Sequence, residues 1–133
     1  MVRGNLDIIV VDDDSSMRLA VQRFLLVSGF RSVTFASAEA LLETDAASTA
    51  SCLVLDIQLS GMSGLNLMQK LKRAGNAVPV IYITAHDDPH TRQQAEAQGA
   101  VAYLTKPFEG SVLIEAVRRA LAGADRHLGI EGH

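Results

Sequence analysis

Five polar side chains follow apolar segments of the chain, at spacings that would bring them together in one crevice. They are Asp12 and Asp13 after residues 8–11, Asp56 after 52–55, Thr84 after 80–83, and Lys106 after 101–104. The stretches between them are long enough for helices that cross from one parallel strand to the next. In an open parallel sheet, ligands bind outside the carboxyl ends of the strands. We therefore expect three carboxylates, a hydroxyl and an ammonium group to share one site.

These residue types suit a divalent cation and a phosphoryl group. Packed carboxylates repel one another, so keeping them ionised is costly unless a cation lies between them. Mg²⁺ prefers oxygen ligands and is usually held by one or two carboxylates together with phosphate oxygens. A carboxylate beside such a cation is a competent nucleophile toward phosphorus, and a lysine can pair with the carboxylate or with the phosphate. The set predicts Mg²⁺-assisted phosphoryl transfer, with the threonine hydroxyl available to bond a phosphate oxygen.

The elements that would hold these residues alternate between strand and helix. Continuous or alternating apolar runs predict strands over residues 6–11, 31–35, 52–55, 78–83 and 101–104. Apolar residues at helical spacing predict helices over about 17–28, 37–42, 65–74 and 110–122, and a further, mostly polar helix is expected over 90–98. Five strand–helix units in succession predict an α/β protein with a doubly wound parallel sheet and helices on both faces.

Two helices carry more specific expectations. Ser15 or Ser16 is placed to cap the first helix, and Asp14 is favoured as a capping residue because a carboxylate suits a helix N-terminus. Three large apolar residues are expected to pack in the core: Phe24, Leu25 and Phe108. The helix over 90–98 has almost no large apolar residue, and Ala95 and Ala97 are its best candidates for core contact. We therefore expect it to be the least firmly held element.

The composition restricts the class of protein. At 133 residues, with 48% hydrophobic and 20% charged residues, the chain fits one globular domain. A net charge of −3 offers no basic stripe, so nucleic-acid binding by this segment itself is not expected. The single cysteine, Cys52, lies in an apolar strand, which excludes a disulfide scaffold and indicates a buried thiol. No apolar run approaches the roughly 20 residues of a membrane span, so a cytoplasmic protein without membrane contact is expected.

Four segments together resemble the receiver domain of two-component response regulators, the CheY-like superfamily. They read VVDDD, LVLDIQLSGMSG, YITAHDD and YLTKPFE, and the resemblance covers about residues 5–122. It implies a flavodoxin-like (βα)5 fold with a five-stranded parallel sheet in the order 2-1-3-4-5. It also implies that a sensor histidine kinase donates a phosphoryl group, after which the domain switches conformation to control an output, with transcription as the first expectation.

The resemblance assigns roles to the acidic residues and their neighbour. Asp56 would be the phosphoacceptor. Asp12 and Asp13 would hold Mg²⁺, with Asp56 and the backbone carbonyl of Gln58 completing the protein ligands. His86 flanks the same site, and it is expected with Gln58 to adjust the rate of dephosphorylation. Like other receivers, the protein is expected to accept and lose its own phosphoryl group rather than to turn over external substrates.

The resemblance also assigns the switch. Lys106 would bridge to the phosphoryl group, and the Lys106–Pro107 peptide bond would be cis. Thr84 and Tyr103 would be the switch pair, with the threonine hydroxyl drawn inward and the tyrosine filling the space. We therefore expect a phosphorylation-dependent dimer or partner surface formed by the helix over 90–98, the strand over 101–104 and the helix over 110–122.

One position departs from the family pattern. Receivers usually carry proline four residues after the phosphoacceptor, whereas this chain has Ser60. The loop is expected to be less rigid for that reason, but no functional side chain is lost. The domain is expected to span residues 5–123, with 124–133 as the start of a linker followed by a tag remnant, because Glu131, Gly132 and His133 look like cloned residues. The natural chain would then continue past about residue 125.

Other functions fit the sequence less well. Mg²⁺-dependent phosphatases of the haloacid-dehalogenase type place their nucleophile on the first strand and a second acid two residues later, whereas Asp56 follows the third strand and Gln58 is not acidic. A degenerate receiver that binds partners without phosphorylation is disfavoured by the intact acid, threonine and lysine set. A stand-alone receiver that acts through protein contacts stays open. His86 and His90 match no structural zinc spacing.

Overall fold

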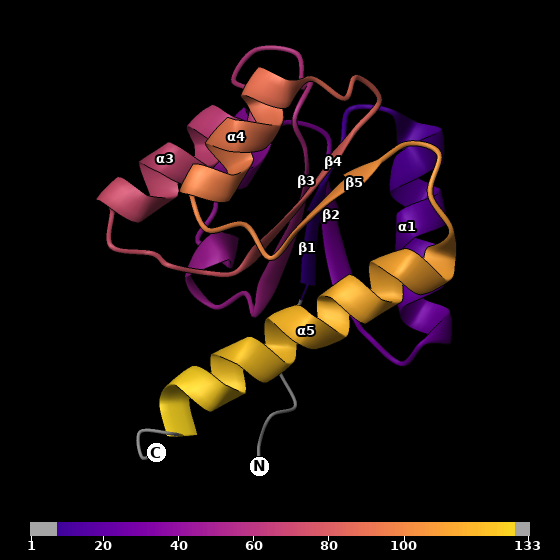
Figure 1. Cartoon of the computed structure of the whole chain (residues 1–133), viewed down its shortest axis with the longest axis vertical. Helices are drawn as coiled ribbons and strands as arrows, with labels where there is room; N and C mark the ends of the chain where they lie inside the picture. Colours follow the sequence, from indigo (N-terminus) through magenta and orange to yellow (C-terminus); the bar gives the residue numbers. More distant parts are fainter. Residues whose placement is uncertain (1–7, 130–133) are drawn as a thin grey trace.

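Five strands and five α-helices alternate along the computed structural model, which describes residues 8–129 and, for side chains, residues 8–123 (Figure 1). The strands are β1 (Ile8–Val11), β2 (Ser32–Phe35), β3 (Cys52–Asp56), β4 (Val80–Thr84) and β5 (Ala102–Thr105). The helices are α1 (Ser15–Val27), α2 (Ala38–Leu42), α3 (Gly64–Arg73), α4 (Pro89–Ala97) and α5 (Gly110–Gly129), with a short 3₁₀ helix, η1 (Ala46–Ser48), before β3. The predicted α/β class is confirmed.

The five strands form one parallel sheet in the order β2-β1-β3-β4-β5, as expected. Every residue of β1, β3 and β4 is buried, because these central strands are covered on both faces. Figure 1 shows α1 and α5 on one side of the sheet and α3 and α4 on the other. The parallel arrangement puts the carboxyl ends of β1, β3, β4 and β5 along one edge of the sheet.

The alternation of side chains along each strand divides the core into two layers. Ile8 and Val10 of β1 pack with residues of α1 and α5, whereas Ile9 and Val11 pack with residues of α2 and α3. Cys52 is fully buried in the first layer, and burial raises the pKa of its thiol to about 12. A structural rather than a reactive thiol follows from this environment.

The beginning of α1 corrects one expectation. Asp14 is the capping residue, and its Oδ1 accepts hydrogen bonds from the backbone amides of Ser16 (2.9 Å) and Met17 (3.4 Å). Ser15 and Ser16 lie inside the helix, so the expectation that one of them caps it is wrong. The carboxylate reaches the free amides of the first turn and suits the positive end of the helix dipole.

The helix α4 also differs from the expectation. Asp88 caps it and Pro89 is its first residue, where a missing N–H costs nothing. Ala95 is buried against the sheet, but Ala97 is exposed, so the expected core contact of Ala97 is wrong. Residues two apart on a helix point to different sides, so only one of the two alanines can face the sheet.

The remaining boundaries lie close to the predicted ones. Residues 6 and 7 of the predicted first strand are outside the described residues, and β4 begins two residues later than predicted. The helix α5 continues to Gly129, past the predicted domain end at residue 123, and residues 130–133 are outside the described range. The division into 5–123 and 124–133 therefore stays a prediction. Over residues 8–129, no helix is both long and apolar enough to cross a membrane.

Candidate functional site

The loop after β1 supplies two of the carboxylates. Asp12 is fully buried, and its Oδ1 accepts a hydrogen bond from the backbone amide of Asp14 at 2.9 Å. Arg18 of α1 donates from Nη1 to the backbone carbonyl of Asp12 at 2.8 Å, which fixes this loop against the helix. Asp13 is exposed at the rim of the site. The capped start of α1 thus positions one buried and one exposed acid side by side.

The third carboxylate, Asp56, is the last residue of β3 and is only 4% exposed. Its Oδ1 accepts a hydrogen bond from the backbone amide of Gln58 at 2.9 Å. Gly64 begins α3 directly against it, and a Cβ at Gly64 would lie 2.5 Å from the carbonyl oxygen of Asp56. Only glycine lets the helix approach the strand end this closely, so it contributes to the position of the acid.

Lys106 joins the acids into one cluster. Its Nζ donates to Asp56 Oδ2 at 2.9 Å and to Asp12 Oδ2 at 3.3 Å. Carboxylate oxygens of Asp12, Asp13 and Asp56 lie within 4.8 Å of one another. The Lys106–Pro107 peptide bond that follows is cis, as expected. Side chains at the ends of three separate strands therefore meet at the carboxyl edge of the sheet, as the sequence predicted.

The charges of the cluster shift the pKa values of its members. Burial raises the pKa of the Asp12 carboxyl, and the charge of Asp56 raises it further, against the opposing hydrogen bond from Asp14 and the charge of Lys106. Burial lowers the pKa of the Lys106 ammonium, but its hydrogen bonds and charge contacts with Asp56 and Asp12 outweigh burial, so the pKa is raised overall. The lysine is therefore firmly cationic, while the site still holds more acids than bases.

This donor set fits a small divalent cation. Three carboxylates with one ammonium group leave excess negative charge in a partly buried place, and all the available ligand atoms are oxygens. Mg²⁺ prefers such ligands and needs few of them from the protein. Among the described residues, these acids form the only group of three or more side chains that could hold a metal ion. The histidines at positions 86 and 90 are not part of this group.

Thr84 ends β4 beside this cluster, but its hydroxyl is already engaged. The residue is fully buried, and its Oγ1 donates to Gln58 Oε1 at 2.6 Å, with the carbonyl oxygen of His86 farther away at 3.3 Å. The backbone amide of His86 donates to the same Oγ1 at 3.0 Å. The sequence predicted a role for the backbone carbonyl of Gln58, but it gave no sign that the glutamine side chain would accept a hydrogen bond from Thr84.

The ring of Tyr103 in β5 is covered by a charged side chain. The guanidinium of Arg92 stacks over its ring, 4.4 Å from the ring centre, and Arg92 pairs with Asp87 at 3.0 Å. The Tyr103 hydroxyl is buried and has no hydrogen-bond partner among the described residues. Burial raises its pKa. An unpaired buried hydroxyl is costly, which is a physical reason for this side chain to have a second position.

Ser60, the residue that departs from the family pattern, contacts the acidic cluster directly. Its backbone amide donates to Asp13 Oδ2 at 3.1 Å, and its Oγ donates to the same oxygen at 3.0 Å. The expectation that the serine makes the loop less rigid did not include these bonds. The sequence held one signal for them, because replacing proline restores a backbone N–H at the rim of a carboxylate site.

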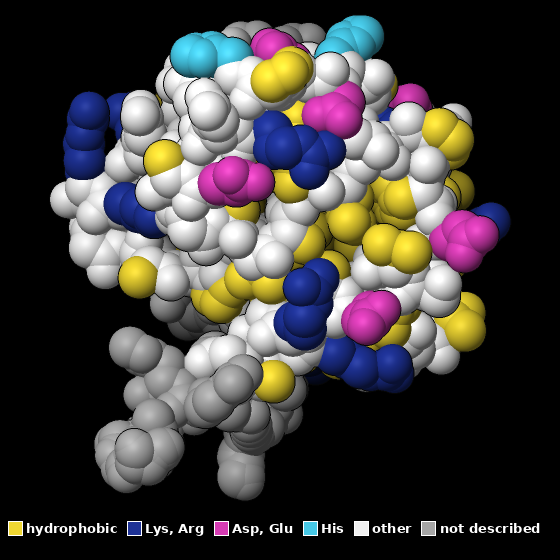
Figure 2. Space-filling view, in the orientation of Figure 1, with side chains coloured by type: hydrophobic (Ala, Val, Ile, Leu, Met, Phe, Trp, Pro, Cys, Tyr) yellow, Lys and Arg dark blue, Asp and Glu magenta, His cyan; other side chains and the backbone are white. Residues whose placement is uncertain are grey.

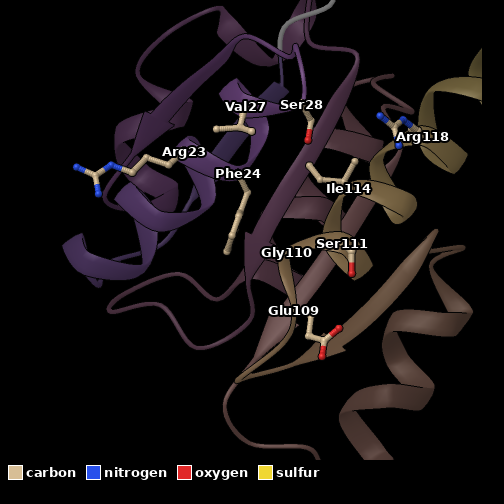
Figure 3. A pocket seen from close by; sticks show the side chains of 9 residues that line it. All are labelled: Arg23, Phe24, Val27, Ser28, Glu109, Gly110, Ser111, Ile114 and Arg118. Carbon is tan, nitrogen blue, oxygen red and sulfur yellow. The ribbon is translucent and has the colours of Figure 1, made fainter.

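A separate groove lies between α1 and α5, away from the acidic cluster (Figure 3). It has a volume of about 720 Å³, and Phe24, Val27 and Ile114 give it an apolar lining beside Arg23 and Arg118. Phe24 is 40% exposed there, so the expectation that it lies in the core is wrong, whereas Leu25 is fully buried. Figure 2 shows hydrophobic side chains gathered on the face between β5, α1 and the start of α5.

Comparison with known proteins places this site in a family. The family model described as the response regulator receiver domain matches residues 8–118. The nodulation protein W of Bradyrhizobium diazoefficiens is 39% identical over 110 residues, which cover 83% of this chain and 48% of that protein. The DNA-binding transcriptional regulator NtrC of Escherichia coli is 40% identical over 113 residues, which cover 85% of this chain and 24% of NtrC. This chain therefore spans about half, or less, of the length of these relatives.

A solved structure agrees with this assignment. The response regulator StyR superposes with a TM-score of 0.84 at 36% identity, and the match covers 94% of this chain and 64% of that one. The family match, the relatives and the strand order all agree. This chain belongs to the receiver domain family of two-component response regulators.

Proposed function

We propose that this domain accepts a phosphoryl group on Asp56 and passes the signal on by a change of conformation. One observation carries the proposal: the carboxylate of Asp56 contacts the ammonium of Lys106 and lies against the acids of the β1 loop. Among the described residues, Asp12 and Asp56 both pair with Lys106, but only Asp56 is linked to Thr84, through the backbone amide and the side chain of Gln58. A sensor histidine kinase is the proposed donor.

The transfer step needs little covalent chemistry from the protein. An oxygen of Asp56 forms a bond to phosphorus, the bond from phosphorus to the donor imidazole nitrogen breaks, and that nitrogen keeps the electron pair. Lys106 faces the phosphoryl oxygens and balances their charge as they approach the acids. Mg²⁺, held by Asp12, Asp13, Asp56 and the backbone carbonyl of Gln58, would neutralise the remaining negative charge.

The conformational step runs through Thr84 and Tyr103. Once its bond to Gln58 is released, the hydroxyl of Thr84 would be free to donate to a phosphoryl oxygen on Asp56. That movement would vacate space beside β5, which Tyr103 borders, and the tyrosine would change its contacts with Arg92. The surface formed by α4, β5 and α5 would change with them, and we propose it as the phosphorylation-dependent dimer or partner surface.

The output is proposed to be transcription. NtrC is described as a DNA-binding transcriptional regulator, and the nodulation protein W is about twice as long as the part matched here. DNA contact would come from a separate domain, because the net charge of −3 gives this segment no basic surface of its own.

The phosphoacceptor is tested by intact mass. The protein is incubated with acetyl phosphate and Mg²⁺, and a single phosphoryl adduct is expected that Asp56→Asn abolishes. Asp45→Asn is the matched control, since Asp45 is outside the cluster and its side chain caps nothing. An undiminished adduct in Asp56→Asn would move the nucleophile to another residue.

A further inference from the structure

Each carboxylate of the acidic cluster is held by hydrogen-bond donors, and the donors differ. Asp12 is held by the Asp14 amide and by Lys106, and Asp56 by the Gln58 amide and by Lys106. Asp13 is the only exposed member, and both of its donors come from Ser60. The orientation of the Asp13 carboxylate therefore depends on a single residue of the loop after β3.

The two bonds from Ser60 end on the same oxygen of Asp13. A carboxylate oxygen has two lone pairs, so the amide and the hydroxyl of Ser60 saturate Oδ2. No hydrogen bond of the described residues ends on Oδ1. An exposed aspartate that is otherwise free to rotate is thus fixed with one oxygen occupied and the other available to a ligand.

We propose that Ser60 is a positioning residue for the cation site, and that it holds Asp13 with Oδ1 free to coordinate. This inference rests on the proposed function, which needs a divalent cation at these acids. Mg²⁺ demands near-ideal geometry, so a carboxylate that is already oriented loses less side-chain freedom on binding. Hydrogen-bonded partners of metal ligands act in this way in metal sites generally.

The residue type is essential to the inference. Proline at position 60 could donate neither of the two bonds, because it has no backbone N–H and no hydroxyl. Alanine would keep the amide bond at 3.1 Å and lose the hydroxyl bond at 3.0 Å. Threonine would keep both donors. The three substitutions therefore grade the number of donors to Asp13 without touching a ligand of the cation.

The test is direct Mg²⁺ binding, measured by calorimetric titration without a phosphodonor. We expect Ser60→Ala to weaken binding about tenfold, since loss of a partner of a metal ligand typically costs 10–100-fold in affinity. Ser60→Pro should weaken it at least as much, and Ser60→Thr should stay near the unsubstituted protein. Ser48→Ala is the matched control, because Ser48 is also an exposed serine whose hydroxyl donates a hydrogen bond, at 2.7 Å to the Asp45 carbonyl, in the short helix η1.

A second background separates positioning from damage to the fold. In the Asp13→Asn protein the ligand that Ser60 orients has already lost its charge, so adding Ser60→Ala should change the residual Mg²⁺ affinity little. An equal loss in both backgrounds, or tighter binding by Ser60→Ala alone, would overturn the inference. If the unsubstituted protein binds no Mg²⁺ at all, the proposed function itself fails. Normal binding with an unaffected Ser60→Ala variant defeats only the role of Ser60.

Discussion

The hydroxyl of Thr84 has a single proton, and that fact makes Gln58 more than a neighbour of Asp56, the proposed phosphoacceptor. The proton is directed to Gln58 Oε1 at 2.6 Å, so the hydroxyl cannot donate to a phosphoryl oxygen at the same time. The backbone of Gln58 meanwhile holds Asp56 at 2.9 Å. Gln58 therefore contacts both Asp56 and Thr84, and in the proposed mechanism its side chain would compete with the phosphoryl group for the Thr84 hydroxyl.

This competition predicts the effect of Gln58→Ala. Removing the acceptor should favour the state in which Thr84 turns to the phosphoryl group, so beryllofluoride, a phosphoryl mimic, should bind more tightly in the presence of Mg²⁺. One hydrogen bond corresponds to a factor of about two to ten in the equilibrium. The measurement is the apparent dissociation constant from an NMR titration. In a Thr84→Val background, Gln58→Ala should not change the affinity for beryllofluoride. If Gln58→Ala made alone also leaves that affinity unchanged, the competition is refuted.

Asp12 gives a prediction about stability in the metal-free protein. Burial and the charge of Asp56 raise its pKa, so the folded protein binds this proton more tightly than the unfolded chain does. Stability from this group is then present at low pH and is lost as the pH rises from the unfolded pKa through the folded one. Asp12→Asn, which imitates the neutral carboxyl, should raise the melting temperature at neutral pH.

The same melts include their own control. The difference between Asp12→Asn and the unsubstituted protein should shrink as the pH is lowered through the folded pKa, whereas Asp45→Asn should show no such trend. The experiment needs a chelator, because a bound cation would favour the ionised acid. A lower melting temperature for Asp12→Asn at neutral pH would mean that the pairing with Lys106 at 3.3 Å outweighs the burial of the carboxylate.

At the scale of elements, the buried strands were the most predictable part of the chain. Their apolar runs appear in the sequence as continuous segments because helices cover both faces of the sheet, and the strand ends then fix where Asp56 and Thr84 lie. The bonds from Ser60 to Asp13 and from Thr84 to Gln58 could not be predicted in the same way. They depend on how loops approach one another in space, and no periodicity in the sequence encodes that distance.

The helix α4 shows the same limit. Its poor apolar stripe predicted a loosely held element, and Ala95 is its one buried residue. The residue just after it, Gln98, nevertheless ties it to the rest of the domain: Tyr82 donates its hydroxyl to Gln98 Oε1, and Gln98 Nε2 donates to the carbonyl of Leu65 at 3.1 Å. The C-terminal end of α4 is thus held by polar contacts that its sequence pattern does not display.

These contacts predict how α4 responds to Gln98→Ala. The substitution leaves the buried Tyr82 hydroxyl without its partner and removes the side-chain bond to Leu65 of α3, so amide hydrogen exchange in α4 should become faster. Gln93→Ala, an exposed position on the same helix, is the control and should leave exchange unchanged. Equal exchange in Gln98→Ala and the unsubstituted protein would show that the side chain of Gln98 is not needed to hold the helix.

Activation should also be visible at this scale. Because Thr84 precedes α4 and Tyr103 follows it, binding of beryllofluoride with Mg²⁺ should change hydrogen exchange mainly over residues 86–110. The pairing of Arg92 with Asp87 and its stacking on Tyr103 are the contacts expected to rearrange. If the largest changes instead fall on residues 15–28 in and around α1, the signal leaves the domain by another surface.

For the whole molecule, two surfaces compete as the place where a second copy binds. The groove between α1 and α5 carries exposed apolar residues, among them Phe24 and Val27, which are 40% and 87% exposed. The α4–β5–α5 surface instead borders Tyr103 and is coupled to Thr84 by position in the chain. If phosphorylation moves Thr84 as proposed, the second surface is the one expected to change, and a ligand shifts an assembly equilibrium only through states that differ in affinity.

We therefore expect beryllofluoride with Mg²⁺ to drive dimerisation through the α4–β5–α5 surface, measured as molar mass by size-exclusion chromatography with light scattering. Glu96→Arg reverses an exposed charge one turn beyond Arg92 on α4 and should prevent the dimer. Val27→Asp, which places a charge in the α1–α5 groove, should leave it intact. The opposite pattern, with the dimer lost in Val27→Asp and kept in Glu96→Arg, would assign assembly to the groove, because its apolar side chains rather than the switch would then provide the contact.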